Sequence, residues 1–431
     1  MDSEILDYVY SLAREGIKLD LAVTKEFSKH LGDPSDDYIS FHMAGSNGKG
    51  STSAFLYNIF QNKARTGLYT SPHLVDFNER IISGREKIKD EYIEEFIKKY
   101  RPEIESLKKT NRNPTFFELT TVLAFKFFQE TNCRYASIEV GLGGRLDSTN
   151  IITPAVSVIT QVGYEHALKL GCSLTSISFE KGGIIKNGIP TVLGDKKPEV
   201  LATIRRITDS RNSKLVCTWE RAEISDVTYS FNGTKFNLST EKKEYRIETA
   251  LAGSFQTNNI ACAVLAAEES GEKILKKDIE NGIKNTRWPG RMQVVSHSPV
   301  VMLDSSHNPP AAHSLVSGYR AITDSEPLLL IGMLADKDAA SYLRVIRKLS
   351  GRIVFTTPDE PERAVPAETL NSLYGSLFEE TKVIPDPLSA YDYCLGTGND
   401  VLVTGSMYLI GKIMKEKGMS VEFFPEKSGR N

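Results

Sequence analysis

A glycine-rich turn between an expected strand and an expected helix is the feature that most constrains this chain. The apolar run at residues 38–41 is typical of a strand, and the apolar spacing at residues 54–60 is typical of a helix. Between them lies His42-Met43-Ala44-Gly45-Ser46-Asn47-Gly48-Lys49-Gly50-Ser51. Glycines let backbone N–H groups converge on phosphate oxygens, and the N-terminus of the following helix adds partial positive charge. The pattern therefore predicts a phosphate-binding loop.

Within this loop, Lys49 is placed to reach the terminal phosphates of a nucleotide, and Ser51 is placed to hold a Mg²⁺ ion. The match to the usual P-loop is imperfect. Met43 stands where that pattern has its first glycine, and Gly50 stands where Ser or Thr follows the lysine. An ordinary glycine turn is the alternative interpretation. The candidate nucleotide-binding set is Asn47, Gly48, Lys49, Gly50 and Ser51.

Composition excludes some classes of protein. The chain has 431 residues, which predicts two or three domains. Its 53 basic and 55 acidic residues give a formal net charge of -2, so we expect neither a nucleic acid nor a membrane as a partner. The five cysteines are scattered without zinc spacing, and the N-terminus lacks the features of a signal peptide. These features favour a reducing, cytoplasmic location.

The first half of the chain alternates apolar strand patterns with helical patterns, which predicts a mostly parallel sheet covered by helices. Expected elements are strands at 134–140 and 155–160 and a helix at 115–130. Residues 214–249 break this rhythm with short alternating strands and an Asn232-Gly233 turn, and we interpret them as an antiparallel patch on the first domain.

A second domain is expected after Trp288-Pro289-Gly290-Arg291, where proline and glycine interrupt a helical pattern that ends near Lys284. We therefore divide the chain into a first domain, residues 1–290, and a smaller doubly wound domain, residues 291–431. Strands of the second domain are expected at 300–303, 328–331, 353–356, 382–384 and 401–404.

Polar residues follow several of the expected strands of the first domain. Glu139 ends one strand and begins a run of three glycines, an arrangement that suits a hard cation beside a nucleotide. His166 follows the next strand, although a lone histidine is more often a packing residue. Ser71 lies in a polar loop at residues 70–81, which is either a surface loop or a cover over the phosphates. Lys181 lies among apolar residues and glycines, so it either extends its charged end to solvent or carries a function.

Later in the chain, Asn259 opens a helix and is placed to contact a base or ribose. Arg291 stands at the domain boundary, where an arginine can clamp phosphate. Asp304 and His307 follow a strand of the second domain, a position that commonly faces a ribose or base.

Together these motifs resemble the Mur ligase superfamily, and within it the folylpolyglutamate synthase/dihydrofolate synthase family. The motifs run in family order over nearly the whole chain. They are Gly45 to Ser51, Tyr69 to Arg80, Phe117-Glu118, Glu139 to Asn150, His166, Glu180-Lys181, Gly183 to Lys186, Gln256, Asn259, Trp288 to Arg291, Asp304, His307 to Pro309, Asp336 to Asp338, Arg363-Ala364 and Gly405-Ser406.

The resemblance implies an α/β fold, with a P-loop ATPase domain that carries a small antiparallel patch, followed by a smaller Rossmann-like domain. It implies ATP-driven addition of L-glutamate to a folate, to dihydropteroate or to both through an acyl phosphate. A Mur-type ligase with another pterin or carboxylate as its acceptor is the first alternative. A module with regulatory nucleotide binding is an alternative from another class. The implied partners are small molecules, and the implied state is a monomer.

The resemblance also assigns roles to residues. Lys49, Lys181 and His307 are the implied catalytic residues, and Asn259, Arg291 and Asp304 match nucleotide-binding positions. Two Mg²⁺ ions are implied, with Ser71, Glu139, His166, Ser51 and Lys181 as the metal-binding set. Lys181 matches a position that is carbamylated in this family, which would turn an amine into an oxygen ligand. Because Arg291 and Asp304 lie beyond the junction, the ATP site would be completed only when the domains close.

The chain departs from the family pattern at three positions. Glu165 replaces the aspartate that usually precedes the metal-binding histidine, which could alter the tautomer of His166. Gly182 replaces the alanine after the carbamylated lysine, and Ser46 replaces the common threonine of the P-loop. None of these changes removes an implied ligand.

Overall fold

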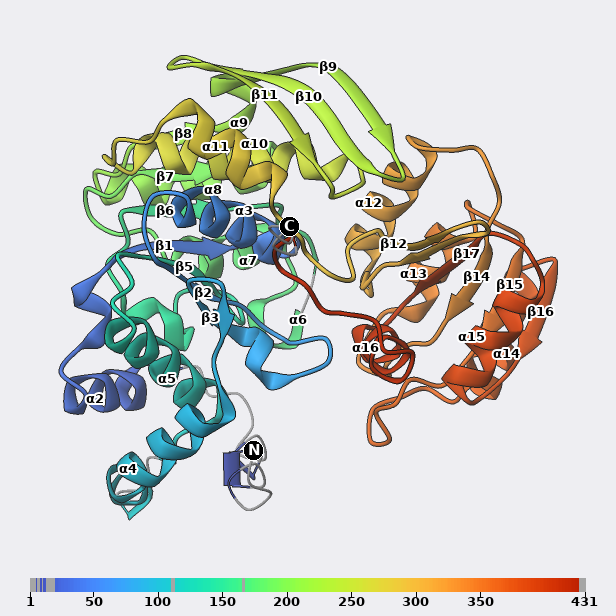
Figure 1. The fold of residues 1–431 in the computed structure, drawn as a ribbon, viewed down its shortest axis with the longest axis horizontal. Helices are drawn as coiled ribbons and strands as arrows, with labels where there is room; N and C mark the ends of the chain where they lie inside the picture. Colours follow the sequence, from blue (N-terminus) through green and yellow to red (C-terminus); the bar gives the residue numbers. More distant parts are fainter. Residues whose placement is uncertain are drawn as a thin grey trace, which may run out of the picture. The chain divides into compact units, whose positions relative to one another are not determined.

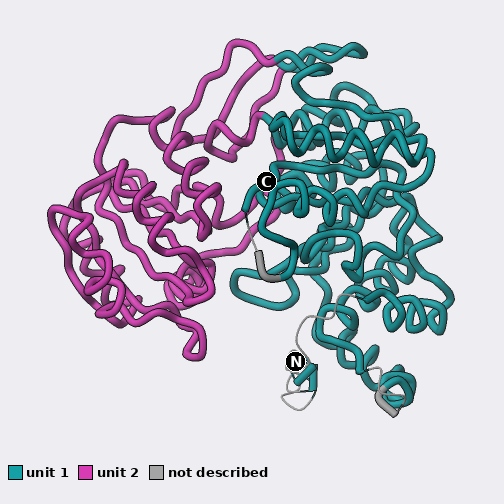
Figure 2. The backbone as a smooth tube through the Cα atoms, turned by 180° about the vertical axis from the view of Figure 1, so that it is seen from behind, with its two compact units in different colours: residues 1–223, 238–245, 258–283 teal, residues 224–237, 246–257, 284–431 magenta. Residues whose placement is uncertain are grey.

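The computed structural model describes residues 20–109, 113–164 and 167–425, together with residues 5, 8, 9, 11 and 12. The chain forms two compact units (Figure 2). The N-terminal unit comprises residues 1–223, 238–245 and 258–283, and the C-terminal unit comprises residues 224–237, 246–257 and 284–431. His166, an implied metal ligand, lies outside the described residues.

The N-terminal unit is built on an eight-stranded sheet with the order β4-β3-β2-β5-β1-β6-β7-β8 (Figure 1). The six strands from β2 to β8 in this order are parallel, whereas β3 and β4 run antiparallel at one edge. The strands are β1 Ile39–Ala44, β2 Thr66–Tyr69, β3 Ile81–Ser83, β4 Glu86–Lys87, β5 Tyr135–Glu139, β6 Val156–Ile159, β7 Thr191–Leu193 and β8 Leu215–Cys217.

Helices cover this sheet because the central strands have apolar side chains to bury on both faces. On β1, Phe41 and Met43 are buried, and the ring of Phe41 packs 4.4 Å from that of Phe60 on α3. The α-helices that begin in the first 283 residues are α2 Ala22–His30, α3 Lys49–Gln61, α4 Asp90–Lys109, α5 Phe116–Glu130, α6 Ala167–Leu170, α7 Leu174–Gly182, α8 Pro198–Ser210, α9 Thr218–Arg221, α10 Phe255–Glu269 and α11 Lys276–Lys284.

Short 3₁₀ helices occur at η2 Pro34–Asp37, η3 Phe77–Arg80 and η4 Ser148–Ile151. The helix expected at 115–130 is α5, and its start is fixed by a capping box. Thr115 Oγ1 accepts a hydrogen bond from the N–H of Glu118, and the Glu118 carboxylate accepts one from the N–H of Thr115.

The antiparallel patch is present as a three-stranded sheet, β11-β10-β9, formed by β9 Ala222–Ser230, β10 Gly233–Thr240 and β11 Glu244–Thr249. The Asn232-Gly233 pair lies at the turn between β9 and β10, as expected. The predicted start of the patch at residue 214 is wrong, because Leu215–Cys217 pairs in parallel with β7 as the last strand of the large sheet. Such a short apolar strand carries no alternation that distinguishes the two sheets.

The C-terminal unit contains a six-stranded sheet with the order β12-β13-β17-β14-β15-β16. Its strands are β12 Gln293–His297, β13 Val300–Leu303, β14 Leu328–Ile331, β15 Arg352–Phe355, β16 Glu380–Val383 and β17 Val401–Thr404. Its helices are α12 Pro309–Arg320, α13 Ala339–Ile346, α14 Ala367–Tyr374, α15 Pro387–Gly396 and α16 Met407–Glu416, with η5 at Gly375–Leu377. All strand pairs except β12–β13 are parallel, which confirms the expected α/β class of this unit.

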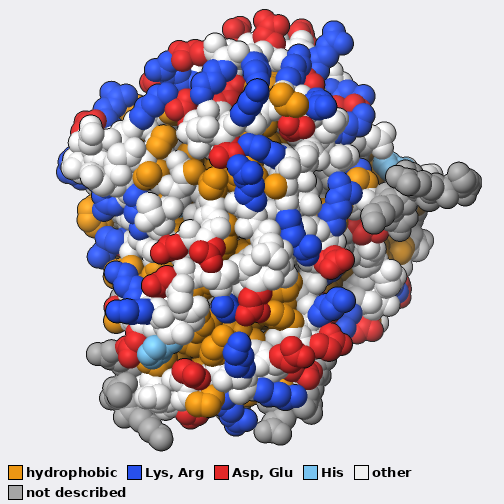
Figure 3. All heavy atoms as spheres, turned by 60° about the vertical axis from the view of Figure 1, so that its left-hand side comes forward, with side chains coloured by type: hydrophobic (Ala, Val, Ile, Leu, Met, Phe, Trp, Pro, Cys, Tyr) orange, Lys and Arg blue, Asp and Glu red, His pale blue; other side chains and the backbone are white. Residues whose placement is uncertain are grey.

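Acidic and basic side chains are interspersed on the face that Figure 3 shows, and no large area of it carries a single sign of charge. Among the described residues, no helix is both long and apolar enough to cross a membrane.

Candidate active site

The predicted phosphate-binding loop lies at the carboxyl end of β1, between the parallel neighbours β5 and β6. The chain leaves β1 toward β2 on one side, whereas β6 lies on the other side. Such a switch point of an open α/β sheet is where ligands bind. Gly48, with φ +89°, caps the start of α3, and a Cβ at this position would collide with the side-chain amide of Asn259. The loop therefore needs glycine at residue 48 both for its backbone conformation and for this close approach.

Lys49 is the first residue of α3, and its Nζ donates a hydrogen bond to the carbonyl oxygen of Gly45 at 3.0 Å. The ammonium group therefore lies over the loop. Ser51 is buried two residues further along the same helix. Asn259, on α10, is 5% exposed and contacts the loop at Gly48. The fold thus brings an ammonium, a helix N-terminus and a side-chain amide together, which can bind a phosphorylated ligand.

Two of the implied metal ligands meet at the same edge of the sheet. Ser71 follows β2 and Glu139 ends β5, and these two strands are parallel neighbours. The backbone N–H of Ser71 donates to Oε2 of Glu139 at 3.3 Å, and Glu139 is 5% exposed. A buried carboxylate beside a hydroxyl-bearing residue offers the oxygen ligands that Mg²⁺ prefers. The residues present therefore fit a magnesium site.

Lys181 lies on α7 and is 1% exposed, which excludes the interpretation that its charged end extends to solvent. The segment after Glu139 packs directly against this part of α7. The N–H of Arg145 donates to the carbonyl of Glu180 at 2.8 Å, and the Arg145 guanidinium pairs with the Glu180 carboxylate at 2.9 Å. A Cβ on Gly144 would lie 2.9 Å from the carbonyl oxygen of Lys181. The glycine run thus lets two elements with implied metal ligands approach closely.

A buried polar chain behind the glycine run was missed by the sequence analysis. His42 Nε2 lies 2.8 Å from Thr149 Oγ1, which donates to Asp147 Oδ1 at 2.5 Å. Because the hydroxyl proton is directed to Asp147, Nε2 of His42 carries a proton and donates. Burial holds the pKa of His42 well below its usual range, so the ring stays neutral. Burial also raises the pKa of the Asp147 carboxyl, while the Thr149 hydroxyl and backbone N–H groups oppose that shift. The signal in the sequence is weak, because a histidine within an apolar strand usually indicates packing.

In the C-terminal unit, Asp304 follows β13 and is 3% exposed. Its Oδ2 accepts a hydrogen bond from the N–H of Met292 at 3.0 Å, and its Oδ1 accepts one from the N–H of Ser306 at 2.9 Å. Met292 has a positive φ of 43° and directly follows Arg291. The Asp304 carboxylate therefore holds the turn that carries Arg291.

His307 lies two residues beyond Ser305, whose carbonyl oxygen is 2.9 Å from His307 Nδ1. Because a carbonyl only accepts hydrogen bonds, Nδ1 carries the proton. In the neutral form of the ring, this tautomer carries its lone pair on Nε2. Such a nitrogen can accept a proton from a reacting amine.

Family models match most of the chain. The Mur ligase middle domain matches residues 43–267, and the Mur ligase glutamate ligase domain matches residues 290–407. A dihydrofolate synthase/folylpolyglutamate synthase of Bacillus subtilis is 32% identical over 417 residues, which cover 95% of this chain and 97% of that protein.

Solved structures have the same fold. The folylpolyglutamate synthase of Thermotoga maritima superimposes with a TM-score of 0.85 at 31% identity, covering 96% of this chain and 95% of that one. Escherichia coli FolC in complex with DHPP and ADP gives a TM-score of 0.86 at 28% identity, covering 96% and 97%. The chain therefore belongs to the Mur ligase superfamily, and within it to the folylpolyglutamate synthase/dihydrofolate synthase family.

Proposed function

We propose that this protein is an ATP-dependent ligase that adds L-glutamate to a folate, to dihydropteroate or to both. The observation that carries the proposal is the sheet edge where the phosphate-binding loop with Lys49 lies beside the buried carboxylate of Glu139. Relatives with matching length are named for these two activities, and one of them was solved with ADP and DHPP.

The proposed reaction has two steps. An oxygen of the substrate carboxylate attacks the γ-phosphorus of ATP, the bond from that phosphorus to ADP breaks, and an acyl phosphate forms. The amine nitrogen of L-glutamate then attacks the acyl carbon and loses a proton, and the bond to phosphate breaks to leave an amide. Lys49 and the N–H groups that begin α3 offset the negative charge where carboxylate and phosphate approach each other.

The proposed metal ligands are oxygen and nitrogen donors at the edge of the sheet. Ser71, Glu139 and His166, together with a carbamylated Lys181, would hold one Mg²⁺ ion, and Ser51 would contact a second ion on the ATP phosphates. Bound Mg²⁺ supplies charge neutralisation at the phosphates. The packing of the glycine run against α7 supports this ligand set, because it brings the buried Lys181 close to the segment that follows Glu139.

The remaining implied residues complete the proposal. Asn259, Arg291 and Asp304 are assigned to the nucleotide, and His307 Nε2 is assigned to accept the proton of the attacking amine. We assign ATP binding to residues 1–290 and the glutamate ligase role to residues 291–431. A monomer in the cytoplasm is the proposed state, and the five free cysteines support a reducing compartment.

Glutamate-dependent release of phosphate tests this function. Purified protein is given ATP, Mg²⁺ and L-glutamate, with dihydropteroate or tetrahydrofolate supplied separately. Activity with both acceptors identifies a bifunctional enzyme, and activity with one identifies its acceptor. A folded protein that binds ATP and is inactive with both would contradict the proposal and favour a Mur-type ligase acting on another pterin or carboxylate.

A further inference from the structure

We propose that Asp195 and Lys197 are positioning residues for the phosphate-binding loop, acting through the backbone of Val162. Both lie between β7 and α8, outside every motif that the sequence analysis assigned to the site. This inference takes one premise from the proposed function, namely that the loop holds the phosphates of ATP.

The loop is held in place by the segment that follows β6. The N–H of Ser46 donates to the carbonyl of Gln161 at 2.7 Å, and the N–H of Asn47 contacts the same oxygen at 3.3 Å. The hydroxyl of Ser46 donates to the carbonyl of Gly163 and accepts from its N–H, each at 2.9 Å. Thr160 Oγ1 donates to the carbonyl of Asn47 at 2.8 Å. The position of residues 160–163 therefore sets the position of the loop.

Both peptide groups of Val162, at the centre of this segment, are bonded to the Asp195–Lys197 pair. Its N–H donates to Asp195 Oδ2 at 2.8 Å, and its carbonyl accepts from Lys197 Nζ at 2.8 Å. Lys197 Nζ also pairs with Asp195 Oδ2 at 2.7 Å. The Asp195 carboxylate, the Lys197 ammonium and the backbone of Val162 thus form a closed ring of hydrogen bonds. Charge-assisted hydrogen bonds of this kind are stronger than neutral ones.

The pair is itself firmly anchored. Asp195 is 4% exposed, and its Oδ1 accepts the N–H of Lys197 at 2.9 Å. The preceding residue, Gly194, donates its N–H to Ile159 at 2.8 Å and accepts a hydrogen bond from Asn258 Nδ2 at 2.8 Å. Because β6 and α10 hold Gly194 next to the pair, a change at Lys197 or Asp195 is transmitted to Val162 and from there to the loop.

The test uses Lys197→Ala and Asp195→Asn in the full chain, with Lys214→Ala as the matched control. Lys214 also forms a 2.7 Å ion pair, with Glu269, but it does not contact the loop. Near-ultraviolet circular dichroism first confirms that each variant is folded. We then measure the Kd for ADP with Mg²⁺ by calorimetry and the hydrogen exchange of the amides at residues 160–164.

Each change at the pair is expected to raise the Kd for ADP by about tenfold, the scale of one charge-assisted hydrogen bond. Amide exchange at residues 160–164 is expected to speed up by a similar factor. In turnover assays, the KM for ATP should rise while the KM for L-glutamate stays unchanged. The double variant should resemble the single variants, because the two residues act as one unit.

Exchange rates and ADP affinity equal to those of the Lys214→Ala control would overturn the proposal. Additive losses of affinity in the double variant would show that Asp195 and Lys197 do not act as one unit. The outcome is separable from the proposed function. A protein that binds ADP but ligates glutamate to no acceptor would refute the ligase function, whereas the binding and exchange measurements would still decide the role of Asp195 and Lys197.

Discussion

At the residue scale, Lys181 shows how burial changes the interpretation of a sequence pattern. Its apolar surroundings allowed either a charged end in solvent or a function, and the structure leaves only 1% of the residue exposed. If Lys181 carries a carbamate, then Lys181→Ala should lower turnover by at least ~10²-fold, a loss typical of a group that stabilises the transition state. Added short carboxylates should restore part of the activity by supplying the missing oxygen ligand. Steady-state kinetics with and without formate or acetate measure this, and full activity of the unrescued variant would refute the role.

Lys186 gives a residue-scale prediction about pH. Burial lowers the pKa of its ammonium from 10.5 to about 8, with Arg211 and Lys25 adding repulsion. Its Nζ donates to the carbonyl of Asn150 at 2.9 Å. Between pH 8 and pH 10.5 the unfolded chain binds more protons at this site than the folded one, so this residue makes stability rise with pH in that window.

Lys186→Met removes the charge, so the variant should be more stable than the wild type at pH 7, by at most about 3 kcal/mol because the site is only partly buried. The advantage should shrink as pH rises from 8 to 10.5. Urea unfolding at a series of pH values measures the difference. A constant difference between variant and wild type across this range would show that the lysine titrates normally.

At the element scale, the strands predicted with the observed bounds are almost fully buried, whereas the largely exposed edge strand β16 was predicted two residues late. Continuous apolar runs indicated β13, β14 and β17 with the bounds observed. The strands that were not predicted are short or half-exposed. β12 is largely half-buried and pairs antiparallel at an edge, and β4 has two residues. Their pairing partners, rather than their own side chains, decide that they are strands, and one sequence does not contain that information.

The residues of the candidate site divide in a similar way, into those with a local sequence signal and those without one. Residues at the ends of the predicted strands, such as Glu139 and Asp304, could be placed because parallel strands end at one edge of a sheet. The partners of His42 and Val162 could not be placed. Thr149 and Lys197 reach them across the fold, through contacts that no local pattern in the sequence encodes.

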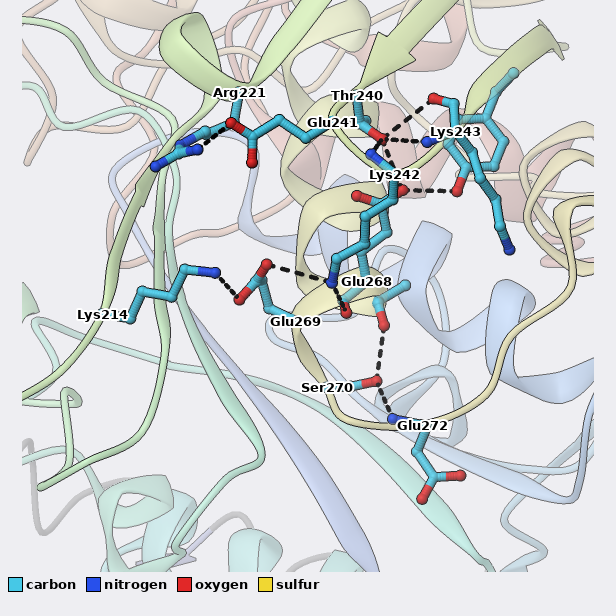
Figure 4. A network of polar contacts seen from close by, with 12 residues as sticks. Lys214, Arg221, Thr240, Glu241, Lys242, Lys243, Glu268, Glu269, Ser270 and Glu272 are labelled. Carbon is cyan, nitrogen blue, oxygen red and sulfur yellow. Dashed lines mark hydrogen bonds and ion pairs between the residues drawn. The ribbon is translucent and has the colours of Figure 1, made fainter.

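The end of α10 gives a prediction at the element scale. Glu268 and Glu269 lie at its C-terminus, where the helix dipole disfavours negative charge. Lys242, from the β10–β11 turn, and Lys214, directly before β8, reach them (Figure 4). Lys242 Nζ donates to the carbonyl of Glu268 at 2.6 Å and pairs with Glu269 at 3.5 Å, while Lys214 pairs with Glu269 at 2.7 Å. Lys242 thus caps the helix and links it to the β10–β11 turn.

Lys242→Ala should lower the free energy of unfolding by about 1 kcal/mol, and by less at high salt because these charges are partly exposed. Lys235→Ala is the control, since its exposed pair with Glu248 caps no helix. Thermal unfolding at low and high salt compares the two. Equal effects of both substitutions would mean that the cap adds nothing beyond a surface ion pair.

At the scale of the whole molecule, the order of motifs along the chain was more informative than any motif alone. The P-loop departs from the usual pattern, and the loop at residues 70–81 resembles a surface loop in composition. Their combination in one order nevertheless indicated the family, which the matches over residues 43–267 and 290–407 confirm. The exact acceptor stays a prediction, because none of these motifs assigns the residues that contact a pterin.

The proposed nucleotide contacts come from both compact units, with Lys49 and Asn259 in the N-terminal unit and Arg291 and Asp304 in the C-terminal unit. Because of this division, we expect a substitution in the C-terminal unit to lower turnover without weakening ADP binding. Arg291→Ala should leave the Kd for ADP within about twofold of the wild type, because the phosphate-binding loop is intact. Turnover should fall at least ~10-fold, since a clamp on the transferring phosphate acts during reaction.

Lys49→Ala provides the opposite case, because it changes the loop itself and should weaken ADP binding as well as turnover. Arg347→Ala, at an exposed position beyond α13, is the control for loss of an arginine in the C-terminal unit. Calorimetry with ADP and steady-state kinetics on the four proteins give the comparison. If Arg291→Ala retains full turnover, the C-terminal unit supplies no such clamp. Arg291→Ala could instead lose ADP affinity and turnover together, as Lys49→Ala should. Arg291 would then contribute to nucleotide binding before the reaction, and the prediction that its loss affects turnover alone would be wrong.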